Sequence, residues 1–199
     1  MSHPNHPLQP LIDQLKRLPG VGGKSAQRLA FHFISLPMSE IKKISEILLY
    51  TKENIKYCSV CFNISFLDTC TICNDPIRET KRLCVVADPK DILAIERARV
   101  FNGRYHVLGG LISPIDGLHP EMLRLSELVE RVKKDQFEEI ILAINPSVEG
   151  DATVLYITSL LKSFSVQLTR LAFGLPMGAE LDYTDEITIQ KALLGRTKI

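Results

Sequence analysis

Long apolar runs and targeting signals are the first things that this sequence lacks. No apolar run approaches the roughly 18 residues that a membrane-spanning helix needs. The segment from Met1 to Pro10 has neither the basic start nor the apolar core of a secretory signal peptide. Cysteine is scarce, with five among 199 residues, and tryptophan is absent. The lack of a membrane span and of a signal peptide predicts a soluble, cytoplasmic protein outside the oxidising compartments in which disulfides persist.

The sequence also lacks a strong net charge, since its 24 Lys and Arg residues nearly balance its 23 Asp and Glu residues. The balance is uneven along the chain. Residues 1–57 contain eight basic and four acidic residues, residues 58–82 three of each, and residues 83–199 thirteen basic and sixteen acidic residues. The positive excess at the front predicts that a polyanion would meet the N-terminal part. A solvated surface would give the same excess, so charge alone does not decide.

Four of the five cysteines are nevertheless concentrated within sixteen residues, as the two Cys-x-x-Cys pairs Cys58/Cys61 and Cys70/Cys73. Each pair can place both sulfurs on one side of a tight turn, and two facing turns make a tetrahedral site suited to Zn²⁺. Disulfides would need an oxidising compartment, and a redox dithiol needs one such pair beside a βαβ unit rather than two in tandem. We expect one structural Zn²⁺, because four protein ligands leave no open position for substrate.

The N-terminal segment predicts two helices joined by Pro19-Gly20-Val21-Gly22-Gly23, a helix-hairpin-helix arrangement. Gly20 and Gly22 allow a sharp turn and close approach to a ligand, and the free amides that open the second helix point at an anion. Lys24 and Arg28 lie one turn apart on that helix, so both can reach the same phosphate backbone. A glycine-rich corner without a ligand is the alternative. A Walker P-loop is excluded by the spacing and by the lack of a preceding strand.

After Pro37, a third helix with apolar residues from Ile41 to Ile55 leads to the cysteines, with Ser39 as its expected N-cap. Its apolar side should pack on the hairpin or on a second subunit.

From Leu83 onward, strands and helices alternate. We expect strands at 83–87, 105–108, 139–144 and 166–172, separated by helices at 89–99, 122–134 and 151–164. This rhythm predicts a parallel sheet with helices on both faces. Cys84 falls inside a buried strand and is expected in the core. A last helix at 185–194 should end at Gly195 and, being short, should dock elsewhere.

Taken in order, these features resemble the bacterial recombination mediator family RecR over nearly the whole chain. Beside the hairpin and the four cysteines, the resemblance rests on Ala143-Ile144-Asn145-Pro146-Ser147-Val148-Glu149-Gly150 and on a C-terminal signature at 170–181. It implies a multidomain α plus α/β fold: a helix-hairpin-helix region at 1–56, a small four-cysteine zinc finger at 57–79, a Toprim-like domain at 80–175, and a C-terminal signature and helix at 176–199.

The resemblance also implies what the protein does. A member of this family would bind DNA without sequence specificity and form a homo-oligomer, a dimer or a tetrameric ring. With RecO, and in some pathways RecF, it would help to load RecA onto gapped single-stranded DNA, close to the nucleoid.

Catalytic Toprim domains hold Mg²⁺ with a glutamate after the first strand and an Asp-x-Asp after the third. Here Ala87, Asn145 and Ser147 stand at those positions, so little remains to bind the ion. We therefore expect no catalytic residues and no enzyme activity, with Asp88, Glu149 and Asp151 as surface acids or partner contacts; weak binding of a metal by these three acids is the alternative. The rival hypotheses are a Mg²⁺-dependent nuclease or topoisomerase-like enzyme, and a protein scaffold without direct DNA contact.

Overall fold

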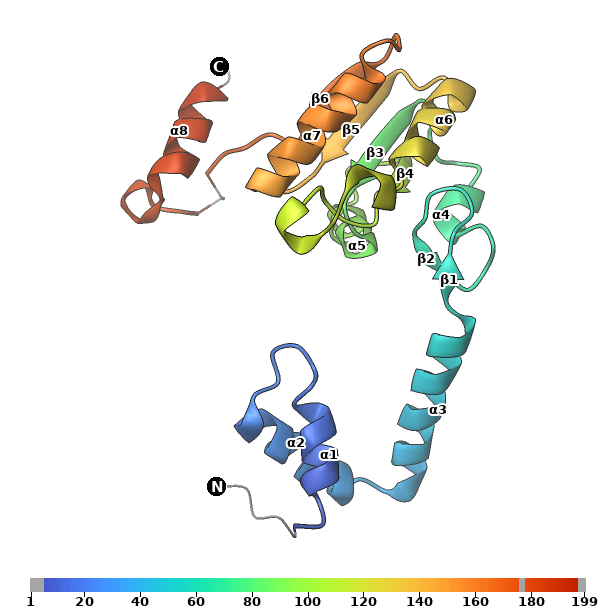
Figure 1. The fold of residues 1–199 in the computed structure, drawn as a ribbon, viewed down its shortest axis with the longest axis vertical. Coiled ribbons are helices and arrows are strands. Elements are labelled where there is room, and N and C mark those ends of the chain that lie inside the picture. Colours follow the sequence, from blue (N-terminus) through green and yellow to red (C-terminus); the bar gives the residue numbers. More distant parts are fainter. Residues whose placement is uncertain (1–5, 176–177, 197–199) are drawn as a thin grey trace. The chain divides into compact units, whose positions relative to one another are not determined.

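The computed structural model describes residues 6–175 and 178–196 of the chain. It divides into two compact units, residues 1–55 and residues 56–199 (Figure 1). The cysteine-rich segment therefore lies in the same unit as the predicted sheet. The finer boundaries expected inside the second unit, at residues 79 and 175, stay a prediction.

The first unit contains three helices, α1 (Gln9–Leu15), α2 (Gly23–Ser35) and α3 (Met38–Asn54). Ile12 and Leu15 of α1 pack against Ala26 and Ala30 of α2, and both alanines are fully buried. Because alanine projects only a methyl group, the two helices can approach closely.

The third helix begins at Met38, directly after its N-cap residue Pro37. The expectation that Ser39 is the N-cap is wrong. Pro37 is the last residue with a non-helical backbone, and Ser39 already lies in the first helical turn. No residue of α3 is buried, and its apolar Ile47, Leu48 and Leu49 are more than half exposed.

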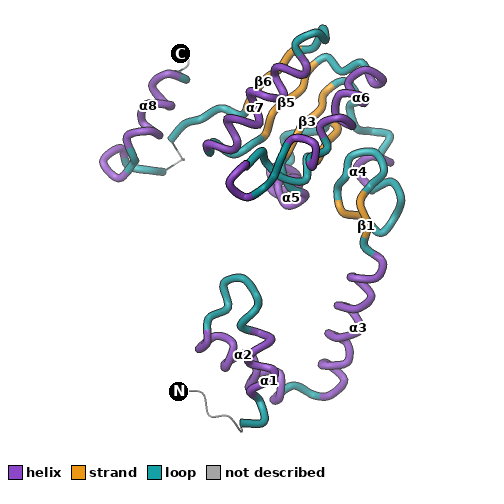
Figure 2. The backbone as a smooth tube through the Cα atoms, in the orientation of Figure 1, coloured by secondary structure: helices purple, strands orange, loops and turns teal. Residues whose placement is uncertain are grey.

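The second unit is built on a parallel four-stranded sheet with the order β4-β3-β5-β6, labelled in Figure 1 and drawn in orange in Figure 2. Its strands are β3 (Arg82–Val86), β4 (Arg104–Val107), β5 (Glu139–Ala143) and β6 (Gln167–Arg170). The connecting helices are α5 (Pro89–Ala98), α6 (Leu125–Asp135) and α7 (Val148–Leu161). This confirms the predicted parallel α/β arrangement.

Alternate residues of β3 face opposite sides of the sheet. Leu83 and Val85 join a core with side chains of α6 and α7, whereas Cys84 and Val86 join a second core with Ile92 of α5. Cys84 is 2% exposed, as expected for a core residue, and burial raises the pKa of its thiol to about 12.

The cysteine-rich segment, residues 56–75, forms a small module on the second of these faces. It contains β1 (Lys56–Tyr57), β2 (Ile64–Ser65) and the short helix α4 (Thr71–Asn74). Phe62 and Ile72 of this cysteine module pack into the same core as Cys84 and Val86. The module thus shares a hydrophobic core with the sheet.

Three 3₁₀ turns and a last helix also lie in the described part of this unit. Two 3₁₀ turns, Pro114–Asp116 and Pro120–Met122, lie between β4 and α6, and a third spans Leu181–Tyr183. The last helix, α8 (Glu186–Leu194), is capped by Asp185 and ends at Gly195 as predicted. Among the described residues, no helix is long and apolar enough to cross a membrane.

Candidate metal centre and nucleic-acid interface

The turn between α1 and α2 is shaped by its glycines. The Val21 amide donates to the Leu18 carbonyl at 3.1 Å, and Gly20 has a φ of +77°, which a residue with a side chain rarely adopts. Gly22 is the N-cap of α2 and offers no side chain to its first amides. The positive end of α2 is therefore left open to an external anion.

The predicted cations flank this open end. Lys24 and Arg28 are both exposed on α2, and neither forms an ion pair or side-chain hydrogen bond with another residue of the described ranges. Hence their charges are available to a phosphate backbone. The structure brings Gly20, Gly22, Lys24 and Arg28 together on one exposed turn and the helix that follows it.

Sequence reasoning missed two further basic residues at the end of α1, Lys16 and Arg17. The Lys16 side chain reaches across the turn, because its Cε lies 3.8 Å from where a Cβ of Gly23 would stand. Its Nζ is 3.2 Å from Asp13 Oδ1, in an exposed pair that holds the ammonium only weakly. The signal was present in the sequence, since both residues stand a few positions before the glycine turn.

The four cysteines of the two Cys-x-x-Cys pairs come together in the second unit. Their sulfur atoms all lie within 4.8 Å of one another, and Cys58, Cys61 and Cys70 are buried. The Cys61 and Cys70 sulfurs are 3.6 Å apart, close to the edge of about 3.8 Å of a tetrahedron with metal–sulfur distances of about 2.3 Å. The cluster is thus able to hold a metal ion.

Backbone amides also point at one of these sulfurs. Cys58 Sγ accepts from the Val60 amide at 3.4 Å and from the Cys70 amide at 3.3 Å. Such bonds fix the position of this sulfur among the other three, as a metal site requires. Hydrogen bonds to Cys70 and Cys73, together with burial, raise the pKa of Cys61. Four crowded sulfurs cannot all carry charge unaided, so a bound cation is needed for all of them to ionise.

The carboxyl edge of the sheet has no comparable cluster. Asp88 caps α5 by accepting from the Lys90 amide at 3.0 Å, and Asp151 pairs with Arg170 at 2.6 Å. Among the described residues, only the four cysteines form a group of three or more His, Cys, Asp or Glu side chains that could hold a metal. Of the three acids expected at this edge, Asp88, Glu149 and Asp151, the first and the last therefore have structural partners within the chain.

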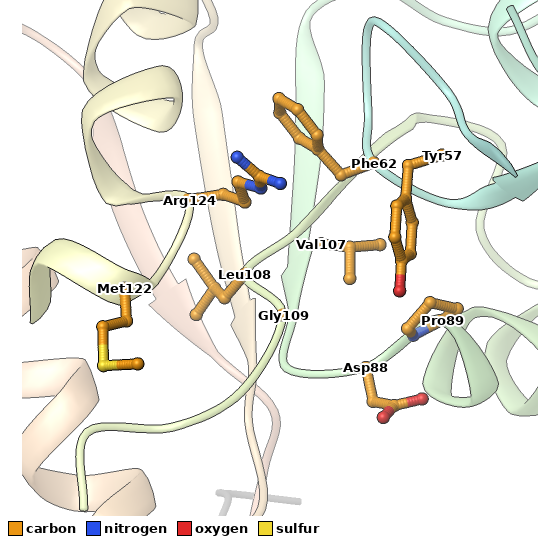
Figure 3. Close-up of a pocket in the computed structure, with 9 residues that line it drawn as sticks. All are labelled: Tyr57, Phe62, Asp88, Pro89, Val107, Leu108, Gly109, Met122 and Arg124. Atoms are coloured by element: carbon orange, nitrogen blue, oxygen red, sulfur yellow. The ribbon is translucent and has the colours of Figure 1, made fainter. Parts of the chain in front are cut away.

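A cavity of about 230 Å³ opens beside this edge, between the cysteine module and the sheet (Figure 3). Tyr57 and Phe62 line it from the module, Asp88 from the start of α5, and Met122 and Arg124 from the segment before α6. The end of β4 and the residues after it, 107–109, form a fourth wall. Sequence reasoning did not single out this cavity, because its walls come from four separate segments of the chain.

Comparison with known proteins agrees with this geometry. A profile described as the RecR helix-hairpin-helix matches residues 8–51, one of the Toprim domain matches residues 81–172, and one described as RecR C-terminal matches residues 174–197. The Recombination protein RecR of Synechococcus elongatus is 53% identical over 196 residues, which are 98% of each chain. The chain belongs to the RecR family. The protein of the same name from a Nocardioides species is 51% identical over 189 residues, 95% of each chain.

Membership confirms the resemblance found in the sequence and places the chain among recombination proteins. These relatives are named for recombination rather than for a catalysed reaction. That naming agrees with the expectation that the chain is not an enzyme, as does the replacement of the catalytic Toprim carboxylates by Ala87, Asn145 and Ser147.

Proposed function

We propose that this protein binds the DNA backbone through its hairpin and acts as a recombination mediator. The observation that carries the proposal is the uncapped start of α2, with Gly20 and Gly22 in the turn. Beside it stand Lys24 and Arg28, which have no ion-pair partner in the part of the chain that the structure describes. Backbone amides and two cations at one exposed site suit phosphate groups and read no base sequence. The binding should therefore depend strongly on salt and weakly on sequence.

The test is fluorescence anisotropy with labelled gapped DNA across a salt series. The double variant Lys24→Glu/Arg28→Glu should bind more weakly. Its slope of log K against log salt should fall by about 1.4 to 1.8, since each lost phosphate contact removes about 0.7 to 0.9. The matched control is Lys42→Glu/Lys43→Glu, which makes the same charge change at exposed positions of α3.

Two results would count against DNA binding through the hairpin. If both double variants weaken binding equally, the effect is one of net charge. If the wild type does not bind at low salt, the scaffold hypothesis, in which DNA is reached through a partner protein, takes its place.

The proposed cofactor is one structural Zn²⁺ per chain, held by Cys58, Cys61, Cys70 and Cys73. Four buried or half-buried sulfurs with near-tetrahedral spacing favour this ion over metals that prefer oxygen ligands. With all four positions filled by protein, the ion would shape the module and take no part in a reaction. Elemental analysis of the purified chain should give one zinc per chain.

The proposed partners follow from the family. With RecO and RecF, the protein would help to load RecA onto gapped single-stranded DNA, working in the cytoplasm at the nucleoid. A homo-oligomer, a dimer or a tetrameric ring, is supported by apolar side chains that lie exposed, including Leu48 of α3 and Ile187 and Leu194 of α8. Light scattering after size exclusion would give the number of copies, and RecA filament formation on coated gaps would test the loading.

A further inference from the structure

The strand β4 is an edge of the sheet, and its outer side would carry unpaired backbone groups if nothing covered it. Two of these groups have partners outside the sheet. The Val107 amide donates to the Cys61 carbonyl at 2.9 Å, and the Tyr105 carbonyl accepts from the Arg131 guanidinium of α6. The first Cys-x-x-Cys pair is therefore joined directly to the edge strand.

The second pair is joined to the same strand by Arg104, the first residue of β4. Its guanidinium donates to the carbonyls of Ile72 and Cys73, each at 2.8 Å, and to that of Asp75 at 3.2 Å. These carbonyls belong to α4 and the residue after it, where a helix leaves its last acceptors unpaired. One of the three carbonyls belongs to a predicted metal ligand.

Apolar and aromatic contacts close the space between the two attachments. Phe62, which follows Cys61, meets the buried ring of His106 edge-on at 5.4 Å and lies under the Arg124 guanidinium at 5.0 Å. Ile72, beside Cys73, packs into the core formed with Tyr105 and Val107. The segment around each Cys-x-x-Cys pair thus makes both hydrogen-bonded and apolar contacts with β4.

From these contacts we infer that Arg104 is a positioning residue of the metal site, and that the metal-loaded cysteine module covers the edge strand of the Toprim sheet. The inference rests on the proposed zinc site and adds to it a role within the second unit. Arg104 fixes the backbone that carries Cys73, so it holds that sulfur in place for the ion. In return, the ion holds the module against β4.

Three variants test the role of Arg104. Arg104→Gln removes the fork of donors, Arg104→Lys keeps the charge but can serve fewer carbonyls, and Arg97→Gln is the control. Arg97 is exposed on α5 and has no hydrogen bond or ion pair in the described part of the chain. Competition with a chelator of known affinity would measure zinc binding. Loss of such an outer partner weakens metal binding by roughly 10- to 100-fold, so we expect that loss for Arg104→Gln, a smaller one for Arg104→Lys and none for Arg97→Gln.

Hydrogen exchange of the wild type tests the edge cover without any substitution. Chelation of zinc should remove protection from the Val107 amide, whose acceptor is the module. The next amide, Leu108, donates to Val86 within the sheet at 2.9 Å and should keep its protection. Equal loss at both positions would mean that the metal supports the whole unit and not this edge.

The zinc measurements distinguish the positioning role of Arg104 from the proposed zinc site itself. Zinc bound equally tightly by Arg104→Gln and by the wild type would overturn the positioning role while leaving the metal site intact. A wild-type chain that retains no zinc would overturn the proposed site, and the positioning role with it.

Discussion

Gly150 lies in the first turn of α7, in the segment that resembles the catalytic Asp-x-Asp-x-x-Gly region of Toprim enzymes. Its conformation is helical, so any residue could adopt its backbone angles. The space around it is the constraint, because a Cβ at this position would stand 2.0 Å from the Asn145 carbonyl oxygen and 3.2 Å from Ile144 Cγ2. We therefore predict that Gly150→Ala destabilises the protein.

The magnitude follows from two opposing effects. At an open helical position, alanine would be about 1 kcal/mol more favourable than glycine. Here the Cβ would have to move at least 1 Å to reach the 3.0 Å below which such contacts are essentially never seen. The obstacle is backbone, so the cost should be near the upper end of the roughly 1 to 3 kcal/mol typical of overpacking. The net loss expected is about 2 kcal/mol.

Urea denaturation followed by far-ultraviolet circular dichroism would measure this loss. The control is Gly23→Ala, which also changes a glycine in the first turn of a helix. Its new Cβ would meet nothing nearer than Lys16 Cε at 3.8 Å, an ordinary contact. Gly23→Ala should therefore leave the stability unchanged or slightly raised. A stabilised Gly150→Ala variant would refute the steric reasoning.

Three further predictions concern other parts of the chain. Burial lowers the pKa of His106 to about 4 from 6.5, so between these pH values the unfolded chain binds more protons than the folded one. The free energy of unfolding should therefore fall by about 3 kcal/mol as the pH drops from 6.5 to 4. A His106→Gln variant should lack this part of the pH dependence. Lys16→Glu should weaken DNA binding and lower the salt slope by about 0.7 to 0.9, and an unchanged slope would exclude this residue from the interface. Cys61→Ser should lose zinc and melt at a lower temperature, because metal binding in such modules is coupled to folding, whereas full zinc content would argue against a four-sulfur site.

Local patterns in the sequence predicted much of the fold. The strands of the sheet are short runs of buried, often β-branched residues such as Leu83 to Val86, and their alternation with helices predicted the parallel arrangement. Cys-x-x-Cys spacing brings two sulfurs onto one turn for local reasons, and so the cluster was predictable. The exact ends of the helices depended on hydrogen bonds of single capping side chains, which were harder to predict. The helix expected to begin at Asp151 begins at Val148, because Ser147 accepts from the Gly150 amide as its N-cap.

What could not be predicted depends on contacts between distant segments. Arg104 lies 32 residues from Ile72 in the sequence, and nothing in either local stretch marks them as partners. Lys16 is a different case, because its place just before the glycine turn was visible in the sequence, and only its approach to the start of α2 required the geometry of the turn. Sequence reasoning found the residues that act through their own spacing and missed those that act across the fold.

The carboxyl edge of the sheet shows why the enzyme hypothesis loses support even where acids persist. Asp88 accepts from the Lys90 amide while Asp91 accepts from the Asp88 amide, a reciprocal pair that closes the start of α5. Asp151 is paired with Arg170, whose guanidinium also stacks over Phe173 at 4.5 Å. A carboxylate that caps a helix or neutralises an arginine has fewer lone pairs to offer a cation. Asp88 and Asp151 thus have partners within the helix and strand structure, and packing accounts for Gly150, so these three residues are explained without a catalytic role.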